Sequence, residues 1–183
     1  MTMGDMMKHF IKVPLAMGML CLGMLSITAY AETQPATETQ SQTGASPQMS
    51  SSVQNQMAGD NFLSANKKKQ GVVTLTDGLQ YKIIKEGTGP RPTDNDQVTV
   101  NYKGQLINGQ EFDSSYKRGE PATFPVAGVI PGWTEALKLM KVGSTWELYI
   151  PASLAYGEQG APPYIGANET LIFQVELLGI KKS

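Results

Sequence analysis

Two carboxylate side chains, Glu111 and Asp113, stand two residues apart in the segment QEFD. On a β-strand this spacing puts both groups on one face, where a pair of carboxylates could act as the acid and the base of a glycosidase. Carboxylates at this spacing are also common on solvated strand faces, and that interpretation is favoured. A hydrolase would require both side chains to face one cleft.

Histidine and cysteine, the usual nucleophiles and metal ligands, occur once each, as His9 and Cys21. Both lie in an N-terminal segment with the features of a cleaved signal peptide. Without them the remaining chain cannot build a Ser-His-Asp or Cys-His site, a zinc centre of the usual kind or an intrachain disulfide. We therefore expect no metal and no cofactor. Any chemistry must come from carboxylates, hydroxyls, backbone groups and apolar surface.

Aromatic side chains are the second candidate set. They fall on inward positions of predicted strands, on the buried face of a predicted helix or in the loop LAYGEQGAPPYIGAN: Tyr102, Phe112, Phe124, Trp133, Tyr156 and Phe173. These rings either fill the centre of the domain or leave a ring-lined hollow, over which the Gly- and Pro-rich loop of residues 156–168 could close. Composition favours neither interpretation.

Strands must position these residues. Four segments alternate apolar and other residues, as strands with one buried face do: residues 79–83, 98–102, 146–150 and 171–177. Shorter strands are predicted over residues 110–113 and 122–126. Asn108 and Gly109 together are a strong turn signal between two of these strands.

One helix is predicted within this region. Trp133, Ala136, Leu137 and Met140 fall at i, i+3, i+4 and i+7, and Gly143 stands just past the end. The predicted fold is therefore α+β, with one antiparallel sheet of about five to six strands curled over one short helix around a single core.

The N-terminal third differs from the rest of the chain. Lys8 and Lys12 precede an apolar run at residues 13–25, and Ala29-Tyr30-Ala31 offers a signal-peptidase site. We predict a signal peptide over residues 1–31, a disordered low-complexity tether over 32–59, a short helix over 60–70 and a folded domain over 71–183. The apolar run is shorter than the roughly 20 residues that span a bilayer, so no membrane span is expected. An exported protein is predicted, with the periplasm favoured over outer-membrane association or secretion.

The charge balance excludes one class of function. The chain has 15 Lys and Arg residues against 16 Asp and Glu residues. Outside the signal segment, Lys67, Lys68 and Lys69 form the one concentrated basic stretch. A nucleic-acid-binding face carries a concentrated basic surface, so no nucleic-acid partner is predicted.

Three longer segments resemble a known family: VTVNYKGQLINGQEFDSS, FPVAGVIPGWTEALKLMKVGSTWELYIPASLAYG and IGANETLIFQVELL. They are similar to the FK506-binding-protein (FKBP) type of peptidyl-prolyl cis-trans isomerase. Together with FLSANKKKQGVVTLTDGLQYKII, they resemble its exported bacterial branch, the macrophage infectivity potentiator-like proteins. The resemblance runs from about Phe62 to the C-terminus.

The resemblance implies an isomerase pocket in the folded domain. It assigns catalytic roles to Asp113, Tyr156, Ile130 and Trp133, and substrate contacts to Tyr102, Phe112, Arg118, Phe124, Val129, Ile165 and Phe173. Trp133 would form the floor against a substrate proline ring, the alternative being a fully covered core tryptophan. The Ile130 N–H and the Tyr156 hydroxyl would donate to substrate carbonyls, while Asp113 would orient Tyr102.

The predicted function is cis-trans isomerisation of X-Pro bonds in exported proteins, by non-covalent binding of the twisted amide. The alternative is a non-catalytic peptide-binding or chaperone module. Predicted partners are proline-containing polypeptides and macrolides of the FK506 and rapamycin type. Because a polar tether replaces most of the N-terminal helical segment typical of the branch, a monomer is predicted.

Overall fold

Residues 50–182 are described by the computed structural model of the chain. The predicted signal peptide, residues 1–31, and residues 32–49 of the predicted tether lie outside the described residues. None of the helices within residues 50–182 is both long and apolar enough to cross a membrane.

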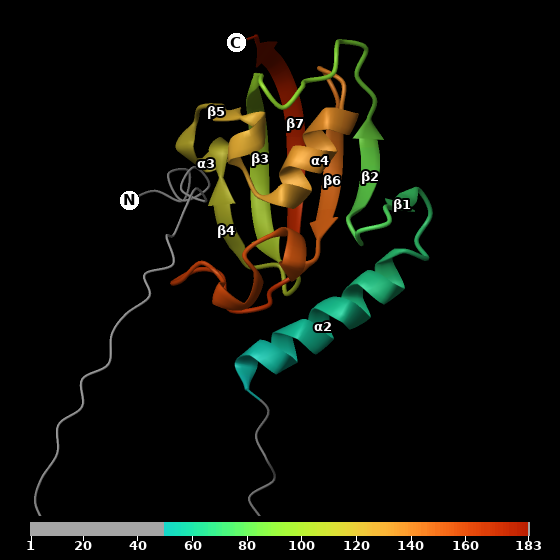
Figure 1. Ribbon diagram of the computed structural model, residues 1–183, viewed down its shortest axis with the longest axis vertical. Helices are drawn as coiled ribbons and strands as arrows, with labels where there is room; N and C mark the ends of the chain where they lie inside the picture. The colour runs from blue at the N-terminus through green and yellow to red at the C-terminus, as the bar shows by residue number, and fades with distance from the viewer. Residues whose placement is uncertain (1–49, 183) are drawn as a thin grey trace, which may run out of the picture. The chain divides into compact units, whose positions relative to one another are not determined.

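The strands of the described chain form one antiparallel sheet with short helices around it (Figure 1). In chain order the strands are β1 (Val72–Thr74), β2 (Gln80–Lys85), β3 (Gln97–Leu106), β4 (Glu111–Ser114), β5 (Ala122–Pro125), β6 (Thr145–Ile150) and β7 (Leu171–Lys181). The helices are α2 (Ser51–Asn66), α3 (Ser115–Arg118) and α4 (Pro131–Leu139), with 3-10 turns at Val126–Gly128, Ala152–Leu154 and Gly157–Gln159. This mixed architecture confirms the predicted α+β class.

Six of the seven strands follow the order β1-β2-β6-β7-β3-β4, and the seventh, β5, pairs with β3. β3 lies along β7 over its whole length, and its other edge is shared between β5 and β4. Side chains alternate between core and solvent along β3, as the predicted period requires. The sheet has more strands than predicted because β1, with three residues, is too short to show a period. Ile83 near the end of β2 is exposed, contrary to its predicted inward phase.

Helix α4 packs on one face of the sheet and lies in front of β6 and β7 in Figure 1. It begins at Pro131, whose fixed φ suits the first helical position. Trp133, Ala136 and Leu137 are buried, as is Met140 directly after the helix. The predicted helical phase is therefore confirmed, and it places Trp133 in the core between α4 and the sheet.

The helix that precedes the sheet begins earlier than predicted. α2 begins at Ser51, where the Ser50 hydroxyl accepts a hydrogen bond from the Val53 N–H (3.4 Å), and it ends at Asn66. The prediction of a tether is therefore wrong for the residues from Ser51 to the start of the predicted helix. The predicted helix boundaries, residues 60–70, are also wrong.

The face that α2 turns toward the domain explains this error. Ser52, Asn55 and Gly59 lie on that face, and each is polar or lacks a side chain. Near the end of the helix, buried Asn66 donates from Nδ2 to Gln80 Oε1 on β2 (3.0 Å). Phe62, whose ring lies 6.0 Å from the Tyr149 ring, is the first apolar side chain on this face, so the part of the helix before it has no apolar stripe that a search for hydrophobic periodicity could detect.

A carboxyl pair, Asp77 in the β1–β2 turn and Glu135 on α4, makes stability depend on pH. The hydrogen bond with Asp77, and then burial, raises the pKa of Glu135 from 4.5 to about 7. The same bond lowers the pKa of Asp77 below its ordinary 3.8. Because the folded state retains a proton on Glu135 that the unfolded chain releases, the resulting stability is complete below pH 4.5 and is lost as the pH rises through about 7.

We expect the free energy of unfolding to fall by on the order of 1 kcal/mol between about pH 5 and pH 8, after allowance for solvent screening. Glu135→Gln should remove most of this slope, because it cannot ionise. The stability that Asp77 contributes is lost only when the pH falls below its ordinary pKa of 3.8, so it does not change between about pH 5 and pH 8. Urea unfolding at several pH values measures the effect, and equal slopes in both proteins would contradict it.

Candidate functional site

Five of the predicted aromatic side chains form a continuous cluster around Trp133. The rings of Tyr102 and Phe173 each lie 5.3 Å from the indole centroid, and the Phe124 ring lies at 5.9 Å, all nearly perpendicular to it. Phe112 meets Phe173 edge-on at 5.5 Å. This geometry suits the charge distribution of aromatic rings. Because four different strands and α4 contribute one ring each, the cluster exists only once the sheet has formed.

The indole of Trp133 is completely enclosed, with no exposed area. Its Nε1–H is buried and has no hydrogen-bond partner among the described residues. Three rings contact the indole, so Trp133 is covered and does not face open space in this structure. Contact between Trp133 and a ligand stays a prediction, and it requires a neighbouring side chain to move.

A polar network borders the cluster at Tyr102. The Tyr102 hydroxyl donates to Asp113 Oδ2 (2.5 Å), while Arg118 donates to the Tyr102 hydroxyl from Nη2 (2.9 Å) and to Asp113 Oδ1 from Nη1. The Asp113 side chain is 7% exposed and that of Arg118 29%. Burial, and then the hydrogen bond to Asp113, raise the pKa of Tyr102 well above its usual range. The phenol therefore stays protonated and holds the buried carboxylate in place.

A one-turn helix, α3, brings Arg118 back onto Asp113. The Ser114 hydroxyl caps the helix by accepting from the Lys117 N–H (3.4 Å), and Gly119 ends it at a left-handed φ of 77°. This helix was not predicted, since its four residues are too few to show a helical period.

The carboxylate pair considered for hydrolysis is divided between two cations. Glu111 forms an ion pair with Lys117 (2.9 Å), whereas Asp113 pairs with Arg118. A glycosidase instead needs its two carboxyl groups to act together across one bond. Within residues 50–182, no group of three His, Cys, Asp or Glu side chains could hold a metal ion.

Ile130, one of the two predicted donor groups, is the N-cap residue of α4. Its carbonyl accepts from the N–H groups of Trp133 (2.9 Å) and Thr134 (3.1 Å). Its own N–H makes no hydrogen bond within the described part of the chain. The remaining apolar residues of the predicted site belong to the same buried core as the rings: Val129, Ile130 and Ile165.

Tyr156, the second predicted donor, follows the 3-10 turn after β6. Burial, and then the charge of Asp113, raises the pKa of the Tyr156 hydroxyl to about 12. The Asp113 charge therefore acts on both Tyr102 and Tyr156. The site therefore combines one buried carboxylate, Asp113, with two phenols from different segments: Tyr102 on β3 and Tyr156 after β6.

Sequence reasoning missed Gly104, which lies on β3. A Cβ at this position would lie 2.6 Å from the Phe112 ring and 2.7 Å from the Phe173 ring. Glycine is therefore the residue that lets both rings approach the strand. A glycine inside a predicted strand was the available signal, because such residues often mark a close approach.

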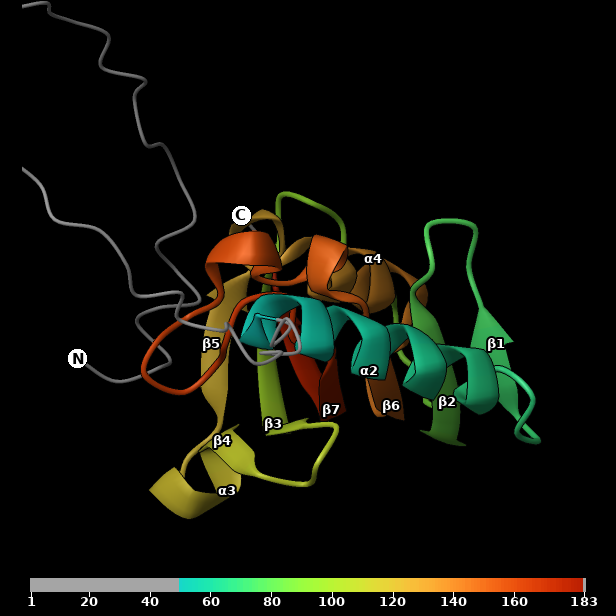
Figure 2. The same ribbon diagram turned by 90° about the horizontal axis from the view of Figure 1, so that it is seen from below.

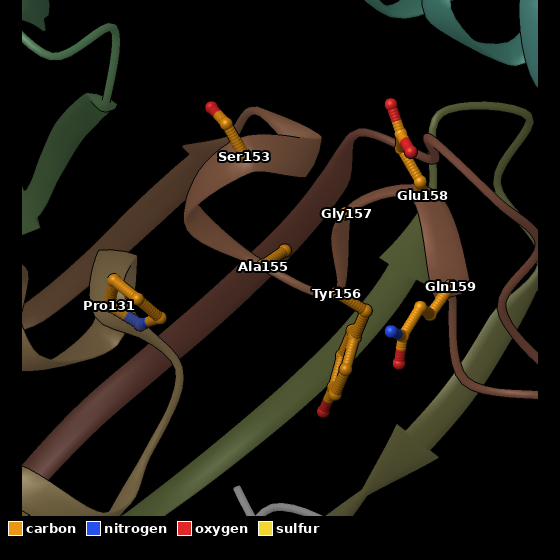
Figure 3. Close-up of a pocket in the computed structure, with 7 residues that line it drawn as sticks. All are labelled: Pro131, Ser153, Ala155, Tyr156, Gly157, Glu158 and Gln159. Carbon is orange, nitrogen blue, oxygen red and sulfur yellow. The ribbon is translucent and has the colours of Figure 1, made fainter. Parts of the chain in front are cut away.

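A pocket of about 450 Å³ lies beside Tyr156 (Figure 3). Its lining residues are Pro131, Ser153, Ala155, Tyr156, Gly157, Glu158 and Gln159. Of these, only Tyr156 belonged to the predicted site, because Pro131 begins α4 and the others come from short turns that carry no periodic pattern. In Figure 3 the Tyr156 ring and the Glu158 carboxylate leave the loop in opposite directions, which gives the pocket an aromatic side and an acidic side.

Two family matches cover most of the described chain. Residues 89–178 match a family described as FKBP-type peptidyl-prolyl cis-trans isomerase. Residues 21–83 match a domain described as amino terminal to FKBP-type peptidyl-prolyl isomerase. The first match contains every predicted site residue.

Individual relatives agree with these matches. Peptidyl-prolyl cis-trans isomerase Mip of Coxiella burnetii is 64% identical over 121 residues, which are 66% of this chain and 53% of that protein. Outer membrane protein MIP of Legionella longbeachae is 58% identical over 130 residues, 71% of this chain and 56% of that protein. The chain thus spans about half the length of these curated relatives.

A solved structure extends the similarity to the fold. The crystal structure of a peptidyl-prolyl cis-trans isomerase from Pseudomonas syringae is 36% identical, with a TM-score of 0.68. The match covers 74% of this chain and 99% of that one. The chain therefore belongs to the FKBP-type peptidyl-prolyl cis-trans isomerase family, in its Mip-like bacterial branch.

Proposed function

We propose that the protein catalyses cis-trans rotation of X-Pro bonds in polypeptides. The observation that carries the proposal is the buried Asp113 carboxylate, bonded by Tyr102 and Arg118 at the edge of the aromatic cluster. Such a site offers fixed dipoles beside apolar surface. This suits a reaction in which no covalent bond is made or broken.

The physical task is to lower a rotation barrier of roughly 18–20 kcal/mol, which amide resonance imposes. The cis and trans forms of an X-Pro bond differ by only about 0.5–1 kcal/mol, so the catalyst needs to favour the twisted state between them. The twisted amide has lost resonance and polarity. An apolar aromatic surface therefore binds the twisted amide better than it binds either planar form.

The proposed roles are those that the family resemblance implies for these residues. The N–H of Ile130 and the hydroxyl of Tyr156 donate to substrate carbonyls on either side of the rotating bond, because fixed donors orient the peptide. Asp113 orients Tyr102 and faces the rotating carbonyl as a polar partner, without transferring a proton. Arg118 neutralises the carboxylate charge.

The proline ring is proposed to pack against the aromatic cluster. Phe112 is the partly buried ring of that cluster, whereas Trp133 is fully covered. Displacement of Phe112 is therefore the proposed route by which a proline ring reaches Trp133 and Phe173.

A non-catalytic module that holds unfolded chains is the second candidate function. The complete burial of Trp133 favours it, because the open pocket beside Tyr156 could hold a peptide that never reaches the indole.

Exchange NMR on a short peptide with one X-Pro bond separates the two candidates. Uncatalysed exchange takes tens to hundreds of seconds at 25 °C. An isomerase present at a small fraction of the peptide concentration should accelerate exchange strongly. A protein that shifts the peptide resonances yet leaves the exchange rate unchanged would instead be the binding module.

The catalysed rate is expected to vary less than about twofold between pH 6 and pH 8, because the mechanism moves no proton. The raised pKa values of Tyr102 and Tyr156 keep both phenols protonated in this range. Glu135 on α4 does titrate there, since its pKa is about 7, so Glu135→Gln is the control. A steep titration that persists in Glu135→Gln would contradict the mechanism.

The protein is further proposed to be exported and to act on exported polypeptides in the periplasm. Support comes from Lys8 and Lys12 before the apolar run at residues 13–25, and from the signal-peptidase pattern that ends at Ala31. The Legionella relative carries the name outer membrane protein.

Macrolide binding and a monomeric state stay predictions. The monomer was predicted because a polar tether through residue 59 would replace the N-terminal helical segment. That premise is wrong from Ser51 onward, where α2 is helical.

A further inference from the structure

The N-terminal half of α2 contacts the segment that joins β6 to β7. Asn55 donates from Nδ2 to the Ala167 carbonyl (2.9 Å), and Asn168 donates from Nδ2 to Ser52 Oγ (2.8 Å). Ser52 and Asn55 share one face of α2, because residues three apart are neighbours on a helix. Figures 1 and 2 both show α2 beside this segment at one end of the sheet.

A close backbone approach lies one turn further along the same face. A Cβ at Gly59 would lie 2.3 Å from Thr170 Oγ1 and 3.1 Å from Thr170 Cβ. Gly59 is buried and Thr170 is 3% exposed, so neither residue has open space around it. α2 therefore lies directly against the residue that precedes β7.

The contacted residues hold one end of a loop that carries part of the proposed site. This loop follows Tyr156 and is closed at its base by a hydrogen bond from the Asn168 N–H to the Gly157 carbonyl (2.8 Å). Ile165 is 2% exposed and lies in the core two residues before Ala167. A shift at Asn168 is therefore transmitted to Gly157, the neighbour of Tyr156. A shift at Ala167 is transmitted along the backbone to Ile165.

We infer that α2 acts as a strap that positions the loop bearing Tyr156 and Ile165. The strap residues Ser52, Asn55 and Gly59 are positioning residues, since they act through the loop and not on the substrate. The inference rests on the proposed isomerase function. It adds that α2, a helix outside the sheet, sets the position of a loop of the proposed pocket. Hydrogen bonds and one close contact suit this role, because they specify geometry with little buried apolar area.

Asn55→Asp tests the strap with a nearly isosteric change. It replaces the amide donor by a carboxylate, which repels the Ala167 carbonyl. Asn61→Asp is the matched control, because Asn61 is exposed on the same helix and the charge change is equal. In the full chain, hydrogen–deuterium exchange over residues 157–170 is expected to rise about three- to tenfold in Asn55→Asp and to stay unchanged in Asn61→Asp.

The KM for an X-Pro peptide is a second readout, and it would not change if Asn55 contributed to stability alone. In the variant, the loop holds its peptide-binding conformation for a smaller fraction of the time. KM for an X-Pro peptide is therefore expected to rise about three- to tenfold, while kcat changes little. Gly59→Ala should raise KM as well, because its methyl group collides with Thr170 Oγ1. Thr170→Ala added to Gly59→Ala removes that atom and should restore KM, measured against Thr170→Ala alone.

Unchanged exchange and unchanged KM in Asn55→Asp, with an active wild type, would overturn the inference. A lower kcat at constant KM, together with a lower melting temperature, would assign Asn55 to stability alone and overturn it equally. An inactive wild type would overturn the proposed function instead. The exchange measurement would then still decide whether α2 holds the loop.

Discussion

Replacing Trp133 by alanine is expected to lower the free energy of unfolding by about 3–5 kcal/mol. The indole has no exposed area and is contacted by three rings that come from three strands, so its removal leaves a cavity that these elements cannot close. Domains are stable by only about 5–15 kcal/mol, so much of the stability would be lost. Urea unfolding followed by far-UV circular dichroism measures the change.

Two further substitutions control this result. Trp133→Phe keeps part of the ring volume and removes a buried N–H that has no partner among the described residues, so a smaller loss of about 1–2 kcal/mol is expected. Leu139→Ala, on the same helix and 37% exposed, should cost less than about 1 kcal/mol. A loss below about 1 kcal/mol for Trp133→Ala would be incompatible with an indole at the centre of the core.

Asp113→Ala is expected to lower kcat/KM for an X-Pro peptide by about ten- to one-hundredfold. Loss of a preorganised polar group at a reacting centre typically costs about this much or more. The substitution removes the buried carboxylate that holds the Tyr102 hydroxyl and leaves Arg118 without its ion-pair partner. Exchange NMR with wild type and variant at equal concentrations measures the ratio.

Glu111→Ala is the matched control for Asp113→Ala. Glu111 lies on the same strand, but its partner Lys117 has a side chain that is 73% exposed, so the ion pair adds little. Activity of Glu111→Ala should stay within about twofold of wild type. Equal losses in both variants would show that charge on β4, and not the Asp113 network, governs the rate.

The strand segments and α4 were predictable because each signals its structure locally. Along β3 the alternation of side chains is complete, and on α4 the apolar positions recur once per turn. The first part of α2, from Ser51 to Gly59, was missed because Ser52, Asn55 and Gly59 make contacts that involve polar groups or no side chain. A polar contact leaves no hydrophobic period in the sequence.

The candidate site was only partly predictable for a related reason. The resemblance to a family supplied the residues, and the structure gathers their rings and the Asp113 network. The closure of the rings over Trp133, the place of Gly104 beneath Phe112 and the pocket beside Tyr156 were not foreseeable. Each depends on how side chains from different strands and loops meet.

The amino-acid sequence by itself determined the α+β class, the inward phase of the rings and the family resemblance. These follow from composition and from patterns within a few residues of one another. The tertiary structure alone decided that Trp133 is sealed, that Asp113 lies between Tyr102 and Arg118, and that α2 lies against the Tyr156 loop. Such contacts join residues distant in the chain, and they depend on strand order, register and the interlocking of side chains, which no local pattern encodes.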